Sequence, residues 1–143
     1  MQRYDAIIVG AGPAGGECAR NLAAAGKQVL LLEKAKDFSI NNYSSGGAPL
    51  DILKTYSLPQ EIVSTYWNKL SLFSSNDSHL WVSSDPMGVV LDFKKLREFL
   101  ALEAQKNGAE VQMHTSFQSY EKKKDFFLVR VKNHDEKESR TLE

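Results

Sequence analysis

Three glycines and one acid are the residues of this chain best placed for binding chemistry. They lie in Gly10-Ala11-Gly12-Pro13-Ala14-Gly15 and in the later pair Glu33-Lys34. Gly10 permits a tight turn, Gly12 lets a pyrophosphate approach the backbone, and Gly15 allows close helix packing. A helix that starts at this turn offers unpaired amides and a positive dipole end to phosphates. Glu33 follows Gly12 by about 20 residues, the spacing of an acid that accepts hydrogen bonds from an adenosine ribose. We therefore predict a dinucleotide site made of these eight residues.

The elements that position these residues form a strand–helix–strand unit. An apolar run at 6–9 predicts a buried strand, a small-residue helix follows, and a second apolar strand at 29–33 ends on the acid. Ala14, Cys18, Leu22 and Ala25 recur at helical spacing, which predicts that they pack on the sheet and that Cys18 is buried. Gly26 supplies the helix stop. An ordinary βαβ unit with a ligand-free glycine turn is the alternative.

Composition narrows the class of protein. The chain has 143 residues, 42% of them hydrophobic, and a formal net charge of zero, so nothing in it favours nucleic acid as a partner. The run at 122–124 of three lysines predicts a solvated hairpin turn. A single cysteine excludes an intrachain disulfide, and no apolar run approaches the roughly 20 residues of a membrane span. A cytoplasmic setting is expected.

The rest of the chain predicts one α/β domain over residues 1–143. Asp92 is placed to cap a helix over 93–107, which Gly108 ends. The other expected elements are a loop at 35–49, a helix from the Ser57–Gln60 capping box to about 69, a loop at 70–79, strands at 80–82, 88–91 and 110–114, a hairpin of 117–121 with 126–132, and a last strand at 139–142. The expected fold is a Rossmann-like βαβ unit with a parallel sheet plus a small antiparallel meander.

Candidates for direct catalysis are weak. His79, His114 and His134 are unclustered in the sequence and follow no metal-ligand spacing, so no metal site is predicted. No nucleophile motif of the Gly-x-Ser-x-Gly type occurs. We predict no catalytic residue in this chain.

The chain resembles the flavoprotein oxidoreductases of the glutathione-reductase-type FAD fold, in the branch that holds p-hydroxybenzoate hydroxylase and geranylgeranyl reductase. The glycine turn, the 29–33 strand, the Ser44–Pro49 loop and the end of the second helix at 107–110 carry the resemblance. It implies FAD as cofactor, with Ser45 and Gly46 among its contacts. It also implies NAD(P)H as the reductant and an apolar, isoprenoid-type substrate in the intact enzyme, which would be peripheral to a membrane.

The chain departs from that family at three points. Phe93 stands where relatives often place an Arg or Gln that touches FAD. Lys94 or Arg97 could take over that contact, but the preferred interpretation is that both are exposed charges on the helix. Serines at 44 and 45 replace the arginine that hydroxylases place beside the glycine loop. The later Gly-Asp segment and the substrate domain are missing. The resemblance therefore implies the N-terminal part of a longer enzyme, inactive alone, whose open strand edges favour self-association.

Three alternatives remain at this point. The chain could be a non-catalytic module that binds the ADP moiety, part of a flavin monooxygenase or halogenase, or an NAD-dependent dehydrogenase domain. If the chain is a dehydrogenase domain, Glu33 would repel the 2′-phosphate of NADP, so NAD is the favoured cofactor of that alternative.

Overall fold

The computed structural model describes residues 1–136 and 138–143, and the chain divides into two compact units. The first unit comprises Met1–Asn41 and Arg97–Glu143, and the second comprises Asn42–Leu96. Each unit has its own sheets, and each is described separately below.

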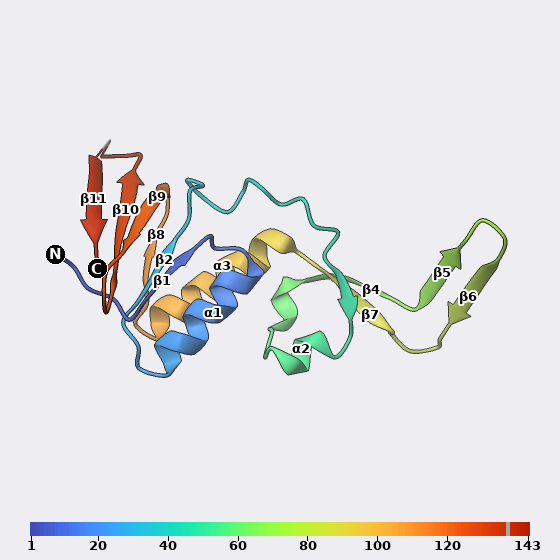
Figure 1. The fold of residues 1–143 in the computed structure, drawn as a ribbon. Helices are drawn as coiled ribbons and strands as arrows, with labels where there is room; N and C mark the ends of the chain where they lie inside the picture. Colours follow the sequence, from blue (N-terminus) through green and yellow to red (C-terminus); the bar gives the residue numbers. More distant parts are fainter. Residues whose placement is uncertain (137) are drawn as a thin grey trace. The chain divides into compact units, whose positions relative to one another are not determined.

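A three-stranded parallel sheet forms the centre of the first unit. Its strands β1 (Ala6–Val9), β2 (Val29–Leu32) and β8 (Glu110–Gln112) lie in the order β1-β2-β8 (Figure 1). All four residues of β2 are buried, as an apolar run in a central parallel strand requires. β1 lies at the sheet edge, and Val9 is 57% exposed, so the expected full burial of this strand is wrong at its end.

Two helices accompany the parallel sheet, α1 (Pro13–Ala24) and α3 (Phe93–Lys106). The Asp92 carboxylate accepts a hydrogen bond from the Lys95 amide at 3.0 Å, which confirms the predicted cap of α3. Gly26 and Gly108 follow the two helices with φ of +77° and +99°, a left-handed conformation that favours glycine. Both predicted helix stops are therefore confirmed.

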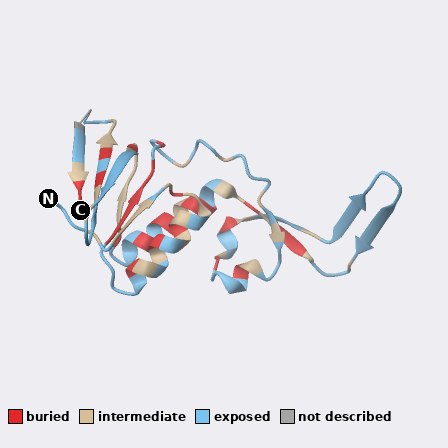
Figure 2. Cartoon of the chain, in the orientation of Figure 1, coloured by how far each residue is buried: buried red, intermediate tan, exposed pale blue. Residues whose placement is uncertain are grey.

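The side chains of β2 alternate between two separate core clusters. Val29 and Leu31 pack with alanines of α1 and α3, whereas Leu30 and Leu32 pack with Val131 and its neighbours on the opposite face of the sheet. Figure 2 shows buried residues on both α1 and α3. The parallel sheet thus lies between a helical layer and a β layer.

That β layer is the predicted meander. β9 (Thr115–Lys122), β10 (Phe127–Asn133) and β11 (Glu138–Leu142) form an antiparallel sheet in the order β11-β10-β9. The three lysines at 122–124 lie at the β9–β10 turn, as expected. The Rossmann-like parallel sheet and the antiparallel meander are both present in the first unit.

The packed face of α1 differs from the prediction. The buried residues of this helix are Gly16, Ala19 and Ala23, whereas Ala14, Cys18 and Ala25 are exposed. An added Cβ on Gly16 would lie 2.8 Å from the Leu100 Cβ, so the two helices approach closely there. Gly16 therefore lies directly against α3, and the predicted burial of the Cys18 thiol is wrong.

The second unit contains two small antiparallel sheets. β3 (Gly47–Pro49), β7 (Gly88–Leu91) and β4 (Val63–Trp67) form one in the order β3-β7-β4, and β5 (Lys69–Phe73) pairs with β6 (Ser78–Val82) to form the other. Between β3 and β4 lie a short helix α2 (Ile52–Thr55) and a 3₁₀ turn η1 (Gln60–Ile62). The predicted strands at 80–82 and 88–91 are confirmed.

Three predictions for this unit are wrong. The last three residues of the loop expected at 35–49 form the strand β3. The stretch expected as a helix to residue 69 contains η1 and β4, and the expected loop at 70–79 is mostly the β5–β6 hairpin. Ser57 has a φ of +48°, so the capping-box motif does not start a helix there. Ser74 closes the hairpin turn, because its backbone amide and hydroxyl both bond to the Asp77 carbonyl oxygen.

Candidate dinucleotide site

The glycine turn joins β1 directly to α1. Gly10 adopts a φ of +98°, which a side chain would strain, and its amide donates to the Leu32 carbonyl oxygen at 2.7 Å. Gly12 is the N-cap of α1 and Pro13 occupies the first turn. The helix ladder starts with the Gly16 amide bonded to the Gly12 carbonyl at 2.8 Å, so earlier amides point out of the helix end. This geometry suits an anion.

The three glycines of the turn have different steric surroundings. A Cβ on Gly15 would lie 2.0 Å from the Gly10 carbonyl oxygen and 3.4 Å from the Ile8 Cγ2, so only glycine lets α1 start this close to β1. A Cβ on Gly12 meets no atom within 4 Å. The space in front of Gly12 is therefore open to a ligand, as a pyrophosphate requires.

Glu33 lies immediately after β2, beside the glycine turn. Its side chain is nearly buried: Oε2 accepts a hydrogen bond from the Ala11 amide at 2.9 Å and Oε1 accepts one from the Ala35 amide at 2.8 Å. A carboxylate has about four acceptor positions, so Oε1, which accepts from the Ala35 amide, retains capacity for a ligand hydroxyl. The acid thus fixes the turn and can still bind a ribose.

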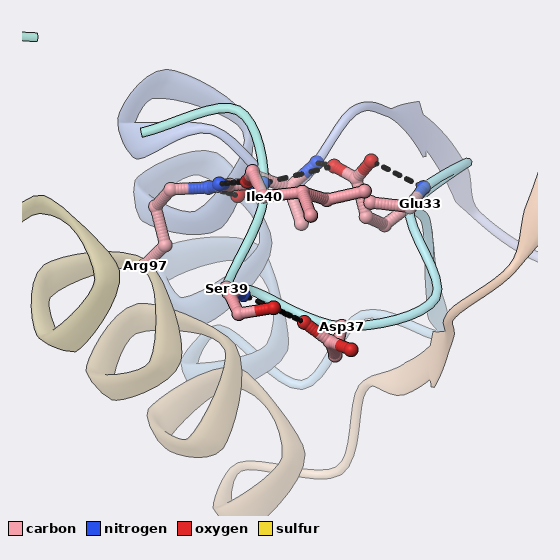
Figure 3. Close-up of polar contacts among 7 residues, drawn as sticks. Glu33, Asp37, Ser39, Ile40 and Arg97 are labelled. Atoms are coloured by element: carbon pink, nitrogen blue, oxygen red, sulfur yellow. Dashed lines mark hydrogen bonds and ion pairs between the residues drawn. The ribbon is translucent and has the colours of Figure 1, made fainter. Parts of the chain in front are cut away.

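Arg97 on α3 completes this cluster, and the expectation that it is an exposed helix charge is wrong. It is 4% exposed, and its Nη2 lies 3.6 Å from the Glu33 Oε2. Its Nε donates to the Ala11 carbonyl at 3.3 Å, and its Nη1 donates to the Ile40 carbonyl at 2.9 Å (Figure 3). The buried ion pair is therefore also hydrogen-bonded to the backbone.

A pattern in the sequence marks Arg97 as an unusual residue. Leu100, Ala101 and Ala104 lie three, four and seven positions after it, and all three are buried. Arg97 thus belongs to the apolar stripe of α3, where an unpaired charge would be costly.

The structure brings together most of the predicted site residues of the first unit. The turn itself contains Gly10, Ala11, Gly12, Pro13 and Gly15, and Glu33 bonds to it at the Ala11 amide. Ala14 and Lys34 are exposed neighbours of these residues. The assignment of all eight to a ligand remains a prediction.

Ser45 and Gly46 belong to the second unit. Ser45 is exposed, and Gly46 has a φ of +70°. The Gly46 carbonyl accepts a hydrogen bond from the Leu91 amide at 2.9 Å, and a Cβ there would lie 2.3 Å from the Leu91 carbonyl oxygen. Gly46 therefore has a clear role in joining the loop to β7, and a cofactor contact of either residue remains a prediction.

Two histidines expected to be separate are neighbours. The rings of His114 and His134 stack with centroids 5.1 Å apart, and the first bonds to Asp135 at 2.8 Å while the second bonds to Ser116 at 2.6 Å. Within residues 1–136 and 138–143, no group of three or more His, Cys, Asp or Glu side chains is arranged to hold a metal ion. In the same part of the chain, every helix is too short or too polar to cross a bilayer.

A family model described as an FAD binding domain matches residues 3–143 of the chain. Among curated proteins, digeranylgeranylglycerophospholipid reductase of Haloferax volcanii is 37% identical over 110 residues, which are 75% of this chain and 26% of the relative. Digeranylgeranylglycerophospholipid reductase 1 of Methanothermobacter thermautotrophicus is 26% identical over 137 residues, 90% of this chain and 34% of the relative. The chain thus spans about a quarter to a third of these proteins.

Solved structures share the fold. A geranylgeranyl bacteriochlorophyll reductase-like protein from Thermoplasma acidophilum has a TM-score of 0.88 at 21% identity, covering 99% of this chain and 37% of its own. Aklavinone-11 hydroxylase, solved with FAD and aklavinone, has a TM-score of 0.71 at 19% identity, covering 99% and 32%. These similarities confirm the predicted Rossmann-like α/β fold.

Proposed function

Because the chain belongs to the FAD-binding domain family, we propose that it binds the ADP half of FAD within a larger flavin-dependent reductase. The observation that most directly supports this proposal is the geometry of the glycine turn. There the open space at Gly12, the N-terminus of α1 and the Glu33 carboxylate adjoin one another. In this arrangement the α1 amides hold the pyrophosphate and Glu33 holds the adenosine ribose. FAD supplies hydride and electron transfer when bound.

The proposed substrate is an isoprenoid lipid with carbon–carbon double bonds, and NAD(P)H is the proposed reductant. Support comes from the curated relatives, which are named as reductases of a digeranylgeranyl glycerophospholipid. We place this activity at the cytoplasmic surface of a membrane, where such a lipid is found. Within this chain the proposal assigns binding and orientation of the cofactor, and no catalytic side chain.

A titration of the purified protein with FAD, NAD and ADP tests the cofactor assignment. Flavin fluorescence and calorimetry should give an FAD affinity at least tenfold above that for NAD. Equal affinities for all three would support the second candidate, a module that recognises only the ADP moiety.

The location of the candidate site residues favours that second candidate, because every site residue in the first unit belongs to the glycine turn or the Glu33 region. Tight NAD binding without FAD binding would favour a dehydrogenase domain and contradict the proposal.

The class of reaction requires the longer protein. Hydroxylase and halogenase structures share this fold, but at 17–23% identity they support only the fold. NAD(P)H oxidation that proceeds without oxygen and saturates an isoprenoid double bond would support a reductase. Oxygen-dependent hydroxylation or halide incorporation would support the monooxygenase or halogenase alternative instead.

A further inference from the structure

Arg97 contacts three separate parts of the proposed site. Its guanidinium lies against the glycine turn at the Ala11 carbonyl, against the Glu33 carboxylate and against the loop that follows β2, residues 35–41. In that loop it donates to the Ile40 carbonyl and lies over the Phe38 ring, 5.0 Å from the centroid. Figure 3 shows the side chain extended from α3 toward Ile40. A single side chain thus joins α3 to two loops of the site.

Hydrogen bonds at both its amide and its carbonyl hold the Ala11 backbone in place. Its amide donates to Glu33 and its carbonyl accepts from Arg97, so both polar groups of this residue are bonded to members of one ion pair. Ala11 lies between Gly10 and Gly12, and its backbone orientation sets that of the Gly12 backbone. The ion pair therefore holds the part of the turn that a pyrophosphate approaches.

Stability alone does not account for an arginine at this position. Burying a charged pair costs desolvation energy, and apolar residues of similar volume often replace such pairs without loss of stability. An apolar side chain would also fit the stripe of Leu100, Ala101 and Ala104. An apolar side chain could not, however, donate to two backbone carbonyls while facing a carboxylate.

We propose that Arg97 is a positioning residue for the adenosine end of the cofactor site, an inference that rests on the proposed function. It holds the Glu33 carboxylate at the ribose position and holds the Ala11 peptide at the pyrophosphate position. The planar fork of the guanidinium allows these contacts at once, and the single ammonium of a lysine does not. Arg97 touches neither substrate nor flavin in this scheme, and it acts through Glu33 and Ala11.

The test compares two ligands, ADP and 2′,3′-dideoxy-ADP, which lacks both ribose hydroxyls. The ratio of their dissociation constants measures the contact between Glu33 and the ribose, whatever the stability of the protein. Calorimetry is performed well below the unfolding temperature on the 143-residue chain and on Arg97→Lys and Arg97→Met variants, with each value normalised to folded protein. We expect the wild-type ratio to be tenfold or more, and the ratio in both variants to fall to within threefold of one.

Arg20→Met is the matched control. Arg20 on α1 also pairs with a glutamate, Glu17, at 2.7 Å, and its guanidinium lies over the ring of Phe99 on α3, 5.7 Å from the centroid. Its ligand ratio should equal that of the wild type. An equal loss of the ratio in Arg20→Met would overturn the inference, because the loss of any largely buried arginine would then have the same effect.

The outcomes separate the two proposals. If the wild type binds neither FAD nor ADP, the proposed function fails. If the wild type binds ADP with a tenfold ratio and the Arg97 variants keep that ratio while their melting temperatures fall, the function stands and Arg97 is only structural. A wild-type ratio near one, with ADP bound, also overturns the positioning role, since Glu33 then does not recognise the ribose.

Discussion

The glycines of the turn differ in what an added methyl group would meet. Gly12 has extended backbone angles, φ −75° and ψ 178°, and open space, whereas Gly15 lies against the Gly10 carbonyl. A side chain added at Gly12 would therefore meet a bound ligand and no protein atom within 4 Å. A side chain added at Gly15 would instead collide with the backbone of the turn and disturb the fold.

Gly12→Ala should leave stability unchanged or raise it by up to about 1 kcal/mol, because alanine fits the native angles there. The same variant should weaken FAD binding by tenfold or more, because the methyl group occupies the pyrophosphate position. Gly15→Ala should instead lower the free energy of unfolding by about 3 kcal/mol through overpacking. Thermal unfolding and FAD titration of both variants check this, and normal FAD binding by Gly12→Ala would refute the turn as the site.

Glu33→Gln should weaken FAD binding by about 1.5–3 kcal/mol, the scale of a hydrogen bond to a charged group. Stability should fall as well, because the Arg97 guanidinium would be left buried without its counter-charge. Glu103→Gln is the control, since this glutamate pairs with the exposed Lys106, and such surface pairs contribute at most about 1 kcal/mol. Fluorescence titration of both variants would show an equal affinity if Glu33 has no part in the site.

At the scale of elements, β7 depends on one close approach. A Cβ on Gly88 would lie 2.1 Å from the Trp67 Cζ2 and 2.5 Å from the Ala48 carbonyl oxygen, on the strands to either side. Gly88→Ala should therefore destabilise the second unit by about 1–3 kcal/mol. Gly47→Ala is a control with its nearest contact at 3.9 Å.

Tryptophan fluorescence can measure this effect, because Trp67 and Trp81 are the two tryptophans of the chain and both belong to the second unit. Unfolding curves that coincide for Gly88→Ala and the wild type would contradict the packing described for β7.

A polar group joins the start of β8 to the residues before β1. The Glu110 carboxylate accepts hydrogen bonds from the Tyr4 hydroxyl, the Gln2 amide and the Gln112 amide. Desolvation acts to raise the pKa of Glu110, but these hydrogen bonds and the nearby Arg140 outweigh it and hold the pKa below its ordinary value of 4.5. Burial, together with the hydrogen bond to the Glu110 carboxylate, raises the pKa of the Tyr4 hydroxyl.

A lowered carboxyl pKa contributes stability that is present above the unfolded-state pKa and is lost as pH falls through the folded-state pKa. Wild-type melting temperature should therefore decline from about pH 4.5 downward. Glu110→Gln should melt lower at pH 7 and show a shallower decline between pH 5 and 3. Parallel melting curves of the two proteins over this range would exclude the Glu110 contribution.

The βαβ unit could be predicted from the sequence because its signals are local. A glycine turn between an apolar run and a helix, with Gly26 as its stop, leaves few other conformations. β4 could not be predicted in the same way, because its strand pairing with β7 outweighs the local capping motif at Ser57. The β-branched and aromatic residues of Val63–Trp67 were the signal that favoured a strand.

The site was predictable only in part, for a similar reason. Glu33 and the glycines follow a recognisable spacing. The role of Arg97 depends on carbonyls at Ala11 and Ile40, which lie 86 and 57 residues away in the sequence. No local pattern gives such partners, although the place of Arg97 in an apolar stripe indicated that it must have some.

At the scale of the molecule, β1 has an apolar surface beside its free edge. Ile7 and Val9 line a groove of about 210 Å³ together with aromatic and aliphatic residues of β9 and β10, namely Phe117, Tyr120, Phe127 and Val129. Among the described residues, β2 is the only strand paired with β1. Such an edge is a template for pairing with another chain.

We expect the 143-residue chain to self-associate through this edge, and Val9→Lys to shift it toward monomer, because lysine blunts edge pairing. Leu102→Lys on α3 is the matched control, since Leu102 is 54% exposed and Val9 57%. Light scattering over a range of concentrations gives the mass of each. A wild-type chain that is monomeric at all concentrations would contradict this prediction.

Because Cys18 is exposed, the chain can also dimerise covalently during the light-scattering measurement. A lone surface thiol oxidises in air to a disulfide between two molecules, a covalent link that dilution does not reverse. Mass measured without a reducing agent would then count bonded pairs as well as associated ones. The same thiol is useful when reduced, because a dye attached to it lies on α1, about 8 Å along the axis from the proposed phosphate-binding end. A single maleimide reaction thus turns the outer face of that helix into an optical reporter of flavin binding.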